Sequence, residues 1–115
     1  MTQSETEIKK EILEGIKREF PDQVHVFRVW CGNMTAKHGA RIIGAAKGTP
    51  DLCGFFQAGI KKGGFLGIEV KTPEGQFSKE QYEFNTRTSQ AGATMIAAVS
   101  WQDCREKLEF WLREF

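Results

Sequence analysis

Two carboxylates and one lysine stand out in the chain because their spacing can bring them together. Asp51 ends the motif GTPD (48–51), and Glu69 and Lys71 end the motif IEVK (68–71). Side chains alternate along a β-strand, so Glu69 and Lys71 project from the same face of their strand. A hairpin that joins the two motifs places Asp51 at the same end of the sheet. The spacing therefore predicts two carboxylates and one ammonium group in close proximity.

Two carboxylates in such proximity repel each other, and a cation such as Mg²⁺ (or Mn²⁺) relieves the repulsion. Mg²⁺ prefers oxygen ligands and binds through one or two carboxylates together with waters and a substrate phosphate. We expect Asp51 and Glu69 to be its ligands, with the backbone carbonyl of Val70 completing the shell. An ion held in this way polarises a phosphate group, and Lys71 can orient the attacking water or neutralise charge in the transition state. The motifs indicate metal-dependent cleavage of phosphodiesters.

Each motif is weaker evidence by itself than the two are together. An E-x-K pattern on a strand also arises from charge pairs across a solvated sheet face. Here, however, Pro50 fixes the backbone directly before Asp51, and Gly48 permits another segment to approach closely. A charged residue within the apolar segment 65–71 is also unfavourable unless it is paired or used. The combination favours a functional site.

The elements that must carry these residues alternate between helix and strand. Residue patterns predict an amphipathic helix at 5–20 and a strand at 24–30, followed by a glycine-rich basic segment that we expect to be a long loop (31–48). There follow two strands in a hairpin, a helix with a capping box, a strand buried on both faces and an amphipathic helix (51–57, 65–71, 78–90, 93–99 and 100–115). The predicted fold is one α/β (α+β) domain over residues 1–115, with an αβββαβ core and a mixed central sheet flanked by helices.

Composition restricts the class of protein. With 115 residues, 40% hydrophobic and 27% charged, the chain is typical of a soluble globular domain. It has no apolar run long enough to cross a membrane and no secretory signal, so we expect a cytoplasmic protein of phage or bacterial origin. The cysteines Cys31, Cys53 and Cys104 fit no standard zinc pattern with His25 and His38, which favours a structural role for all three cysteines.

The net charge of +1 is unevenly distributed. Segment 21–71 carries seven basic and three acidic side chains, and two of those three acids are Asp51 and Glu69. A local positive surplus favours contacts with phosphate groups whatever the net charge. A solvated basic loop explains the charge pattern equally well.

The order of elements and the motifs GTPD and IEVK together resemble the PD-(D/E)xK nuclease superfamily. More narrowly, the chain resembles the virus-type replication–repair nuclease (VRR-NUC) group. Further matches are Arg28 on the first strand, the glycine-rich basic segment, and the sequence FSKEQ that opens the second helix (77–81). The resemblance covers roughly residues 5–100. It implies a restriction-endonuclease-like fold and a Mg²⁺- or Mn²⁺-dependent DNA endonuclease without an organic cofactor.

The resemblance also assigns roles to individual residues. It implies metal binding by Asp51 and Glu69, positioning of water by Lys71 and a supporting polar role for Gln81. It further implies an acid on the first helix that faces the metal. Glu7 matches this acid best and Glu11 is second, while Glu14 also lies on the face that we expect beside the apolar stripe. The candidate phosphate contacts are Arg28, Arg41 and Lys47.

The resemblance suggests a substrate, and two alternatives remain beside it. Small stand-alone members of this group resemble junction resolvases, which implies a homodimer acting on branched DNA such as four-way junctions, with the C-terminal helix as one candidate interface. The first alternative is the same chemistry on flaps or on a defined duplex sequence. The second is a DNA-binding module on a nuclease scaffold without catalytic activity.

Overall fold

The computed structural model of the chain describes residues 3–30, 33–35 and 37–113, and for residues 33–35 and 41–43 only the backbone is described. The elements follow one another as α1 (Glu5–Glu19), β1 (Val24–Arg28), β2 (Asn33–Thr35), β3 (Arg41–Ile43), β4 (Leu52–Phe56), β5 (Phe65–Val70), α2 (Lys79–Gln90), β6 (Thr94–Ala98) and α3 (Trp101–Leu112). The predicted mixed sheet with flanking helices is confirmed. None of the described helices is long and apolar enough to cross a bilayer.

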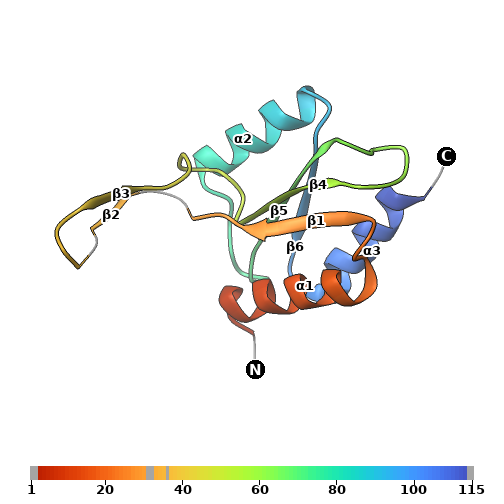
Figure 1. Cartoon of the computed structure of the whole chain (residues 1–115), viewed down its shortest axis with the longest axis horizontal. Helices are drawn as coiled ribbons and strands as arrows, with labels where there is room; N and C mark the ends of the chain where they lie inside the picture. Colours follow the sequence, from red (N-terminus) through yellow and green to blue (C-terminus); the bar gives the residue numbers. More distant parts are fainter. Residues whose placement is uncertain (1–2, 31–32, 36, 114–115) are drawn as a thin grey trace.

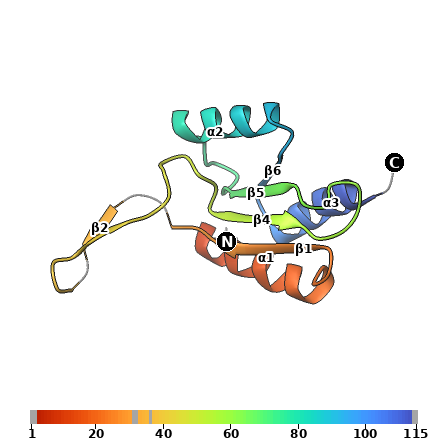
Figure 2. The same cartoon turned by 45° about the horizontal axis from the view of Figure 1, so that its top comes forward.

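The central sheet has four strands in the order β1-β4-β5-β6. Strand β4 is antiparallel to both β1 and β5, whereas β5 and β6 run parallel and are connected through α2. Figure 2 shows the resulting layers, with α2 on one side of the sheet and α1 with α3 on the other. Strand β5 therefore lies inside the sheet between β4 and β6, and it carries the EVK motif at its end.

The core lies between the sheet and the helices α1 and α3. Helix α1 buries one stripe of side chains, because Ile8, Ile12 and Ile16 recur at helical spacing. Helix α3 contributes Cys104 and Leu108, with more apolar residues packed around them (Trp101, Trp111 and Leu112). These residues of α3 pack against the core, and a dimer interface on this helix stays a prediction. Phe115, the last residue of the predicted stripe, lies outside the described residues.

Two predictions about local structure were wrong. Segment 31–48, which we expected to be a loop, contains the antiparallel pair β2–β3, and this hairpin extends away from the body of the molecule (Figure 1). Its three-residue strands are too short to show a clear alternation in the sequence. Strand β6 is not buried on both faces but alternates between buried and half-buried residues. The reason is that α2 covers one of its faces incompletely: all of α2 lies in the described part of the chain, and none of its residues is buried.

Candidate active site

Asp51 and Glu69 lie side by side at one end of the sheet. Asp51 directly precedes β4, and because Leu52 pairs with Ile68, it stands opposite Glu69 on β5. The two carboxyl groups are joined by a hydrogen bond. The structure therefore brings together the two carboxylates that the hairpin was predicted to place at one end of the sheet.

Two glycines make room for the turn that presents Asp51. Pro50 is buried against β5, where a Cβ atom on Gly67 would lie 2.9 Å from the proline ring. Gly48 has a φ of +95°, and a Cβ atom there would lie 2.4 Å from the carbonyl oxygen of Glu80 in the first turn of α2. The turn is thus held between β5 and α2, which fixes the direction of the aspartate that follows it.

Glu69 is a buried acid in an otherwise apolar strand, with 5% of its surface exposed. The pKa of its carboxyl group is raised from 4.5 to about 8, first by burial and then by the negative charge and hydrogen bond of Asp51. The charge of Lys71 opposes this shift, and that of Glu5 adds to it. With a pKa of about 8, this carboxyl group retains a proton at neutral pH.

Gln81 orients the Glu69 carboxyl group. Its side-chain Nε2 donates to Glu69 Oε1 over 2.8 Å, while its Oε1 accepts from the backbone N–H of Ser78 over 2.8 Å. Its own backbone N–H donates to Ser78 Oγ, which completes the predicted capping box of α2. The side-chain amide is therefore fixed at both ends. This arrangement places Gln81 where a supporting polar role was predicted.

Lys71 follows β5 directly, and its Nζ lies 5.8 Å from the centroid of the Phe77 ring. Its ammonium group is close enough to Glu69 to lower the pKa of that carboxyl group. Its backbone N–H donates to Ala98 on β6 over 3.0 Å. In a trans peptide the preceding carbonyl points the opposite way, so the Val70 carbonyl is directed toward β4, the side from which Asp51 comes. That is the direction a metal ligand from this residue needs.

The prediction that Glu7 or Glu11 faces the site was wrong. Glu7 belongs to the capping box of α1, where its carboxylate accepts from Ser4 Oγ over 3.0 Å, and Glu11 accepts from the side-chain amide of Gln3. Both acids are exposed, as is Glu14. Local hydrogen bonding at the helix start, together with position around the helix, directs these side chains away from the sheet.

Two other residues of α1, Glu5 and Lys9, face the site instead. Lys9 Nζ lies 3.6 Å from Asp51 Oδ1, and the charge of Glu5 raises the pKa of Glu69. Both are within the apolar stripe, since Glu5, Ile8, Lys9 and Ile12 follow the spacing i, i+3, i+4, i+7. The three acids that we considered lie about 180–240° around the helix from Glu5. A charged residue within the stripe, rather than beside it, was the signal that would have found these two.

Of the two predicted phosphate contacts whose side chains are described, Arg28 shares a groove with one of the carboxylates. It ends β1, is exposed, and lines a groove with Lys9 and Asp51. Arg41 begins β3, but its side chain lies outside the described part of the chain. Lys47 lies elsewhere, beside α2, and its own partner there is a carboxylate.

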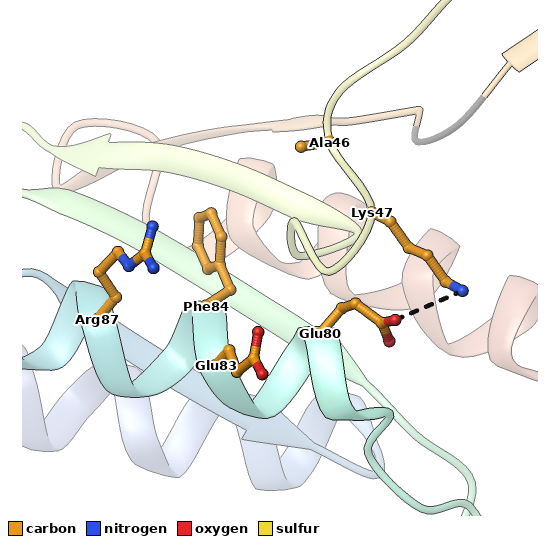
Figure 3. A pocket seen from close by; sticks show the side chains of 6 residues that line it. All are labelled: Ala46, Lys47, Glu80, Glu83, Phe84 and Arg87. Atoms are coloured by element: carbon orange, nitrogen blue, oxygen red, sulfur yellow. Dashed lines mark ion pairs between the residues drawn. The ribbon is translucent and has the colours of Figure 1, made fainter.

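Lys47 Nζ is 3.7 Å from Glu80 Oε1, at the end of a small pocket of about 190 Å³ between the segment before β4 and α2 (Figure 3). A hydrogen bond to its own backbone, and then the charge of Lys47, lower the pKa of the Glu80 carboxyl group. The opposite end of the pocket is formed by Arg87, with Phe84 between the two ends. Lys47 is largely exposed, so it can exchange Glu80 for a phosphate at little cost.

The residues present fit a divalent cation with few protein ligands. Within the described ranges, no group of three or more His, Cys, Asp or Glu side chains is arranged to hold a metal. The two carboxylates and the Val70 carbonyl remain, and Mg²⁺ commonly binds through one or two carboxylates and fills its other positions with water and phosphate. A cation bound by Asp51 and Glu69 would displace the proton that Glu69 retains. The pair thus has the chemistry of an Mg²⁺ site.

Neither of the two described cysteines belongs to this site, although Cys53 on β4 donates from its Sγ to the Pro50 carbonyl over 3.7 Å. Cys53 and Cys104 are buried, and burial raises the pKa of the Cys104 thiol to about 12, so that it is neither a nucleophile nor a metal ligand at neutral pH. Cys31 lies outside the described residues. For the two described thiols, burial fits the structural role that was predicted.

The chain was also compared with known proteins. No protein-family model, no curated protein and no solved structure matches it. The function must therefore be argued from the residues of the site and their geometry.

Proposed function

We propose that this chain is a Mg²⁺- or Mn²⁺-dependent endonuclease that hydrolyses DNA phosphodiester bonds, with the chemistry of the PD-(D/E)xK superfamily and of its VRR-NUC group. One observation carries the proposal: Glu69, buried near the end of an inner strand, stands opposite Asp51 and accepts a hydrogen bond from Gln81. A buried carboxyl pair is unfavourable unless it is used. A divalent cation is the ligand that makes it favourable.

Each residue of the site has a defined part in this proposal. When bound, the cation supplies Lewis-acid polarisation of the scissile phosphate. Asp51 and Glu69 hold the cation, with the Val70 carbonyl beside them, and Gln81 keeps the Glu69 carboxylate in one orientation through its 2.8 Å hydrogen bond. Lys71 orients the attacking water and neutralises the charge that develops on the phosphate oxygens.

The substrate in this proposal is branched DNA such as a four-way junction, cut by a homodimer. A chain of 115 residues offers little surface to bind a DNA helix, whereas a two-fold dimer presents two active sites to two strands. Arg28 is suited to contact a phosphate close to the cleavage point, because it lines the same groove as Asp51. Lys47 is suited to a more distant phosphate contact beside α2.

The test is a cleavage assay on a four-way junction, a flap and a linear duplex, each with Mg²⁺, Mn²⁺ or EDTA. We expect metal-dependent cutting that Glu69→Gln and Lys71→Ala abolish. The matched control is Glu83→Gln, which makes the same chemical change at an exposed position of α2. Absence of cutting under every condition, or cutting that Glu69→Gln leaves unchanged, would show the proposal to be wrong. Cutting of linear duplex at a fixed sequence would instead exclude the junction substrate.

One observation favours a second function, a DNA-binding module without catalytic activity. Lys9 already places a positive charge 3.6 Å from Asp51, so one of the two carboxylates has a partner without any metal. Isothermal titration with Mg²⁺ and Mn²⁺ separates the two functions. Metal binding that Glu69→Gln removes supports the nuclease, whereas DNA binding without metal binding supports the module.

A further inference from the structure

A groove of about 350 Å³ opens beside Asp51, on the side of the site that faces away from α2. It is lined by one residue of α1, the end of β1, the two residues after β1 and the carboxylate (Lys9, Arg28, Val29, Trp30 and Asp51). Its volume is within the roughly 300–1,000 Å³ typical of sites for small ligands. Since Asp51 belongs to both, whatever occupies the groove is in contact with the candidate active site.

The charged residues of the groove suit a phosphate. Lys9 from α1 and Arg28 from the end of β1 supply two positive charges, and Asp51 supplies one negative charge. The backbone N–H of Val29 donates to the Asp51 carbonyl over 2.9 Å, which fixes the end of β1 against the turn that presents the carboxylate. One positive charge is therefore left for a ligand, at a place where a phosphodiester is the natural counter-charge.

Trp30 is an exposed aromatic side chain held in a fixed place. Its carbonyl accepts from the backbone N–H of Ala45 over 2.8 Å, and its indole lies against the backbone of Gly44, where a Cβ atom would come within 2.4 Å of Cε3. Despite this support, 41% of the residue remains exposed, and it lines the groove. A supported indole beside two cations is the arrangement on which nucleic-acid bases stack.

We propose that this groove binds one unpaired nucleotide of the DNA strand adjacent to the scissile phosphate. The base stacks on Trp30, and the phosphate of that nucleotide lies between Lys9 and Arg28. The proposal rests on the nuclease function above and adds a feature of its substrate, since a base can reach the groove only where the helix is open. It predicts a preference for branch points and single-stranded tails over continuous duplex. Every base has an aromatic face, so this preference is independent of sequence.

The experiment measures binding without cleavage, in EDTA. The probes are fluorescein-labelled duplexes with a single-stranded thymidine tail, in which one nucleotide at a time, from the duplex end outward, is replaced by an abasic residue. For the unmodified chain we expect affinity to fall at one tail position by about 5- to 100-fold, the range that base–aromatic stacking contributes. The other tail positions should have little effect. If affinity were the same whichever tail nucleotide is abasic, the proposal would be overturned.

Variants assign the effect to the groove. Trp30→Ala should bind the intact tail as weakly as the unmodified chain binds the critical abasic probe, and its own scan should be flat. Trp30→Phe, which keeps an aromatic face, should retain most of the effect even if the alanine variant folds poorly. Phe110→Ala is the matched control, because Phe110 is an aromatic residue of α3 with 47% exposure and does not line the groove. An unchanged scan in Trp30→Ala would overturn the assignment.

Two further results separate this proposal from the nuclease function. Lys9→Ala and Arg28→Ala should each weaken binding of every probe alike and reduce the slope of affinity against salt by about 1. The same probes are then incubated with Mg²⁺. Cleavage together with an affinity that is the same for every abasic position would contradict the nucleotide groove but not the nuclease function. An affinity that depends on the abasic position, without cleavage in any metal, would support the groove and contradict the nuclease function.

Discussion

Helices α1 and α2 begin in the same way and serve the site in different ways. Each starts with a serine and a capping box that is closed by the third residue of the helix, Glu7 in α1 and Gln81 in α2. The Glu7 carboxylate can only accept hydrogen bonds, and its Oε1 accepts them from the backbone N–H and the hydroxyl of Ser4 at the helix start. The Gln81 amide accepts at the cap and also donates to Glu69. The same local motif therefore leads to the site only where the side chain has a second kind of hydrogen-bonding group.

The two helices also differ in how they are held. Helix α1 is fixed by buried isoleucines, and its polar contribution to the site, Lys9 and Glu5, lies within the apolar stripe. In α2, which is described over its whole length, no side chain is buried, and it meets the sheet mainly through half-buried residues such as Phe84 against Phe65. Burial thus positions one helix, and polar contacts help to position the other. Four predictions test this contrast.

The largest effect is expected at Glu69, to which Gln81 of α2 donates and whose pKa the charge of Glu5 of α1 raises. Glu69→Gln keeps the shape of the side chain but cannot become the carboxylate that binds the cation, so we predict a loss of cleavage of about 1,000-fold or more, measured as kcat/KM on the preferred DNA. In the same background, Gln81→Ala should have little additional effect, because the carboxylate that it orients is gone. Independent, additive losses would show that Gln81 does not act through Glu69.

The difference in burial predicts a difference in stability. Ile12 is fully buried in α1, and Ile12→Ala should lower the free energy of unfolding by about 2–5 kcal/mol. Phe84 on α2 is only half-buried, so Phe84→Ala should cost about 1 kcal/mol although it removes a larger side chain. Urea denaturation followed by circular dichroism measures both. Equal costs would mean that α2 is held by its apolar residues after all.

The capping residues provide a matched pair of variants. Gln81→Ala and Glu7→Ala both delete the third residue's side chain from a capping box, and each should lower stability by about 0.5–1 kcal/mol. Only Gln81→Ala should lower cleavage, by about 10- to 100-fold, since the residue that orients a metal ligand is lost. Parallel thermal melts and cleavage rates make the comparison. If the two variants lose activity equally, the hydrogen bond from Gln81 to Glu69 has no special part in the reaction.

The pKa of Glu69 predicts a further effect, a dependence of stability on pH. This carboxyl group has a pKa of about 8 in the folded chain and near 4.5 when unfolded, so the folded state binds more protons between these values. Stability should therefore fall as pH rises from about 4.5 through 8, and Glu69→Gln should remove this part of the decline. Because Mg²⁺ competes with the proton on Glu69, stabilisation by Mg²⁺ should be greater at pH 8.5 than at pH 6. Thermal melts with Mg²⁺ or EDTA test this; an Mg²⁺ effect independent of pH would contradict it.

Much of the fold could be predicted from the sequence because the longer elements bury regular patterns. The repeat of Ile8, Ile12 and Ile16 predicted α1, and the capping box at Ser78 predicted α2, nearly to the residue. The hairpin β2–β3 could not be found, since its strands of three residues lie in a glycine-rich basic segment with no alternation to read. The partial burial of β6 could not be predicted either. It depends on how closely α2 approaches the sheet, which no local sequence pattern encodes.

The residues of the site likewise include some that the sequence could predict and some that it could not. The carboxylate pair could be predicted because a hairpin register relates Asp51 and Glu69 through the backbone alone. The contribution of α1 could not, because Lys9 and Glu5 reach the sheet across the packing of two layers. The rotation of a helix about its axis decides which residues face inward, and Glu7 and Glu11 lie on the wrong side of it. Register is local information, whereas the docking of a helix is not.

The low burial of α2 has a consequence for how long the site stays assembled. Elements that bury little apolar surface open at a lower free energy than the core of the same molecule. When α2 lifts while the sheet stays folded, Gln81 leaves Glu69, and Glu80 leaves the turn that contains Gly48. The carboxylate then loses its orientation without any unfolding of the core. The free energy of this opening would therefore set the fraction of time during which all parts of the site are assembled.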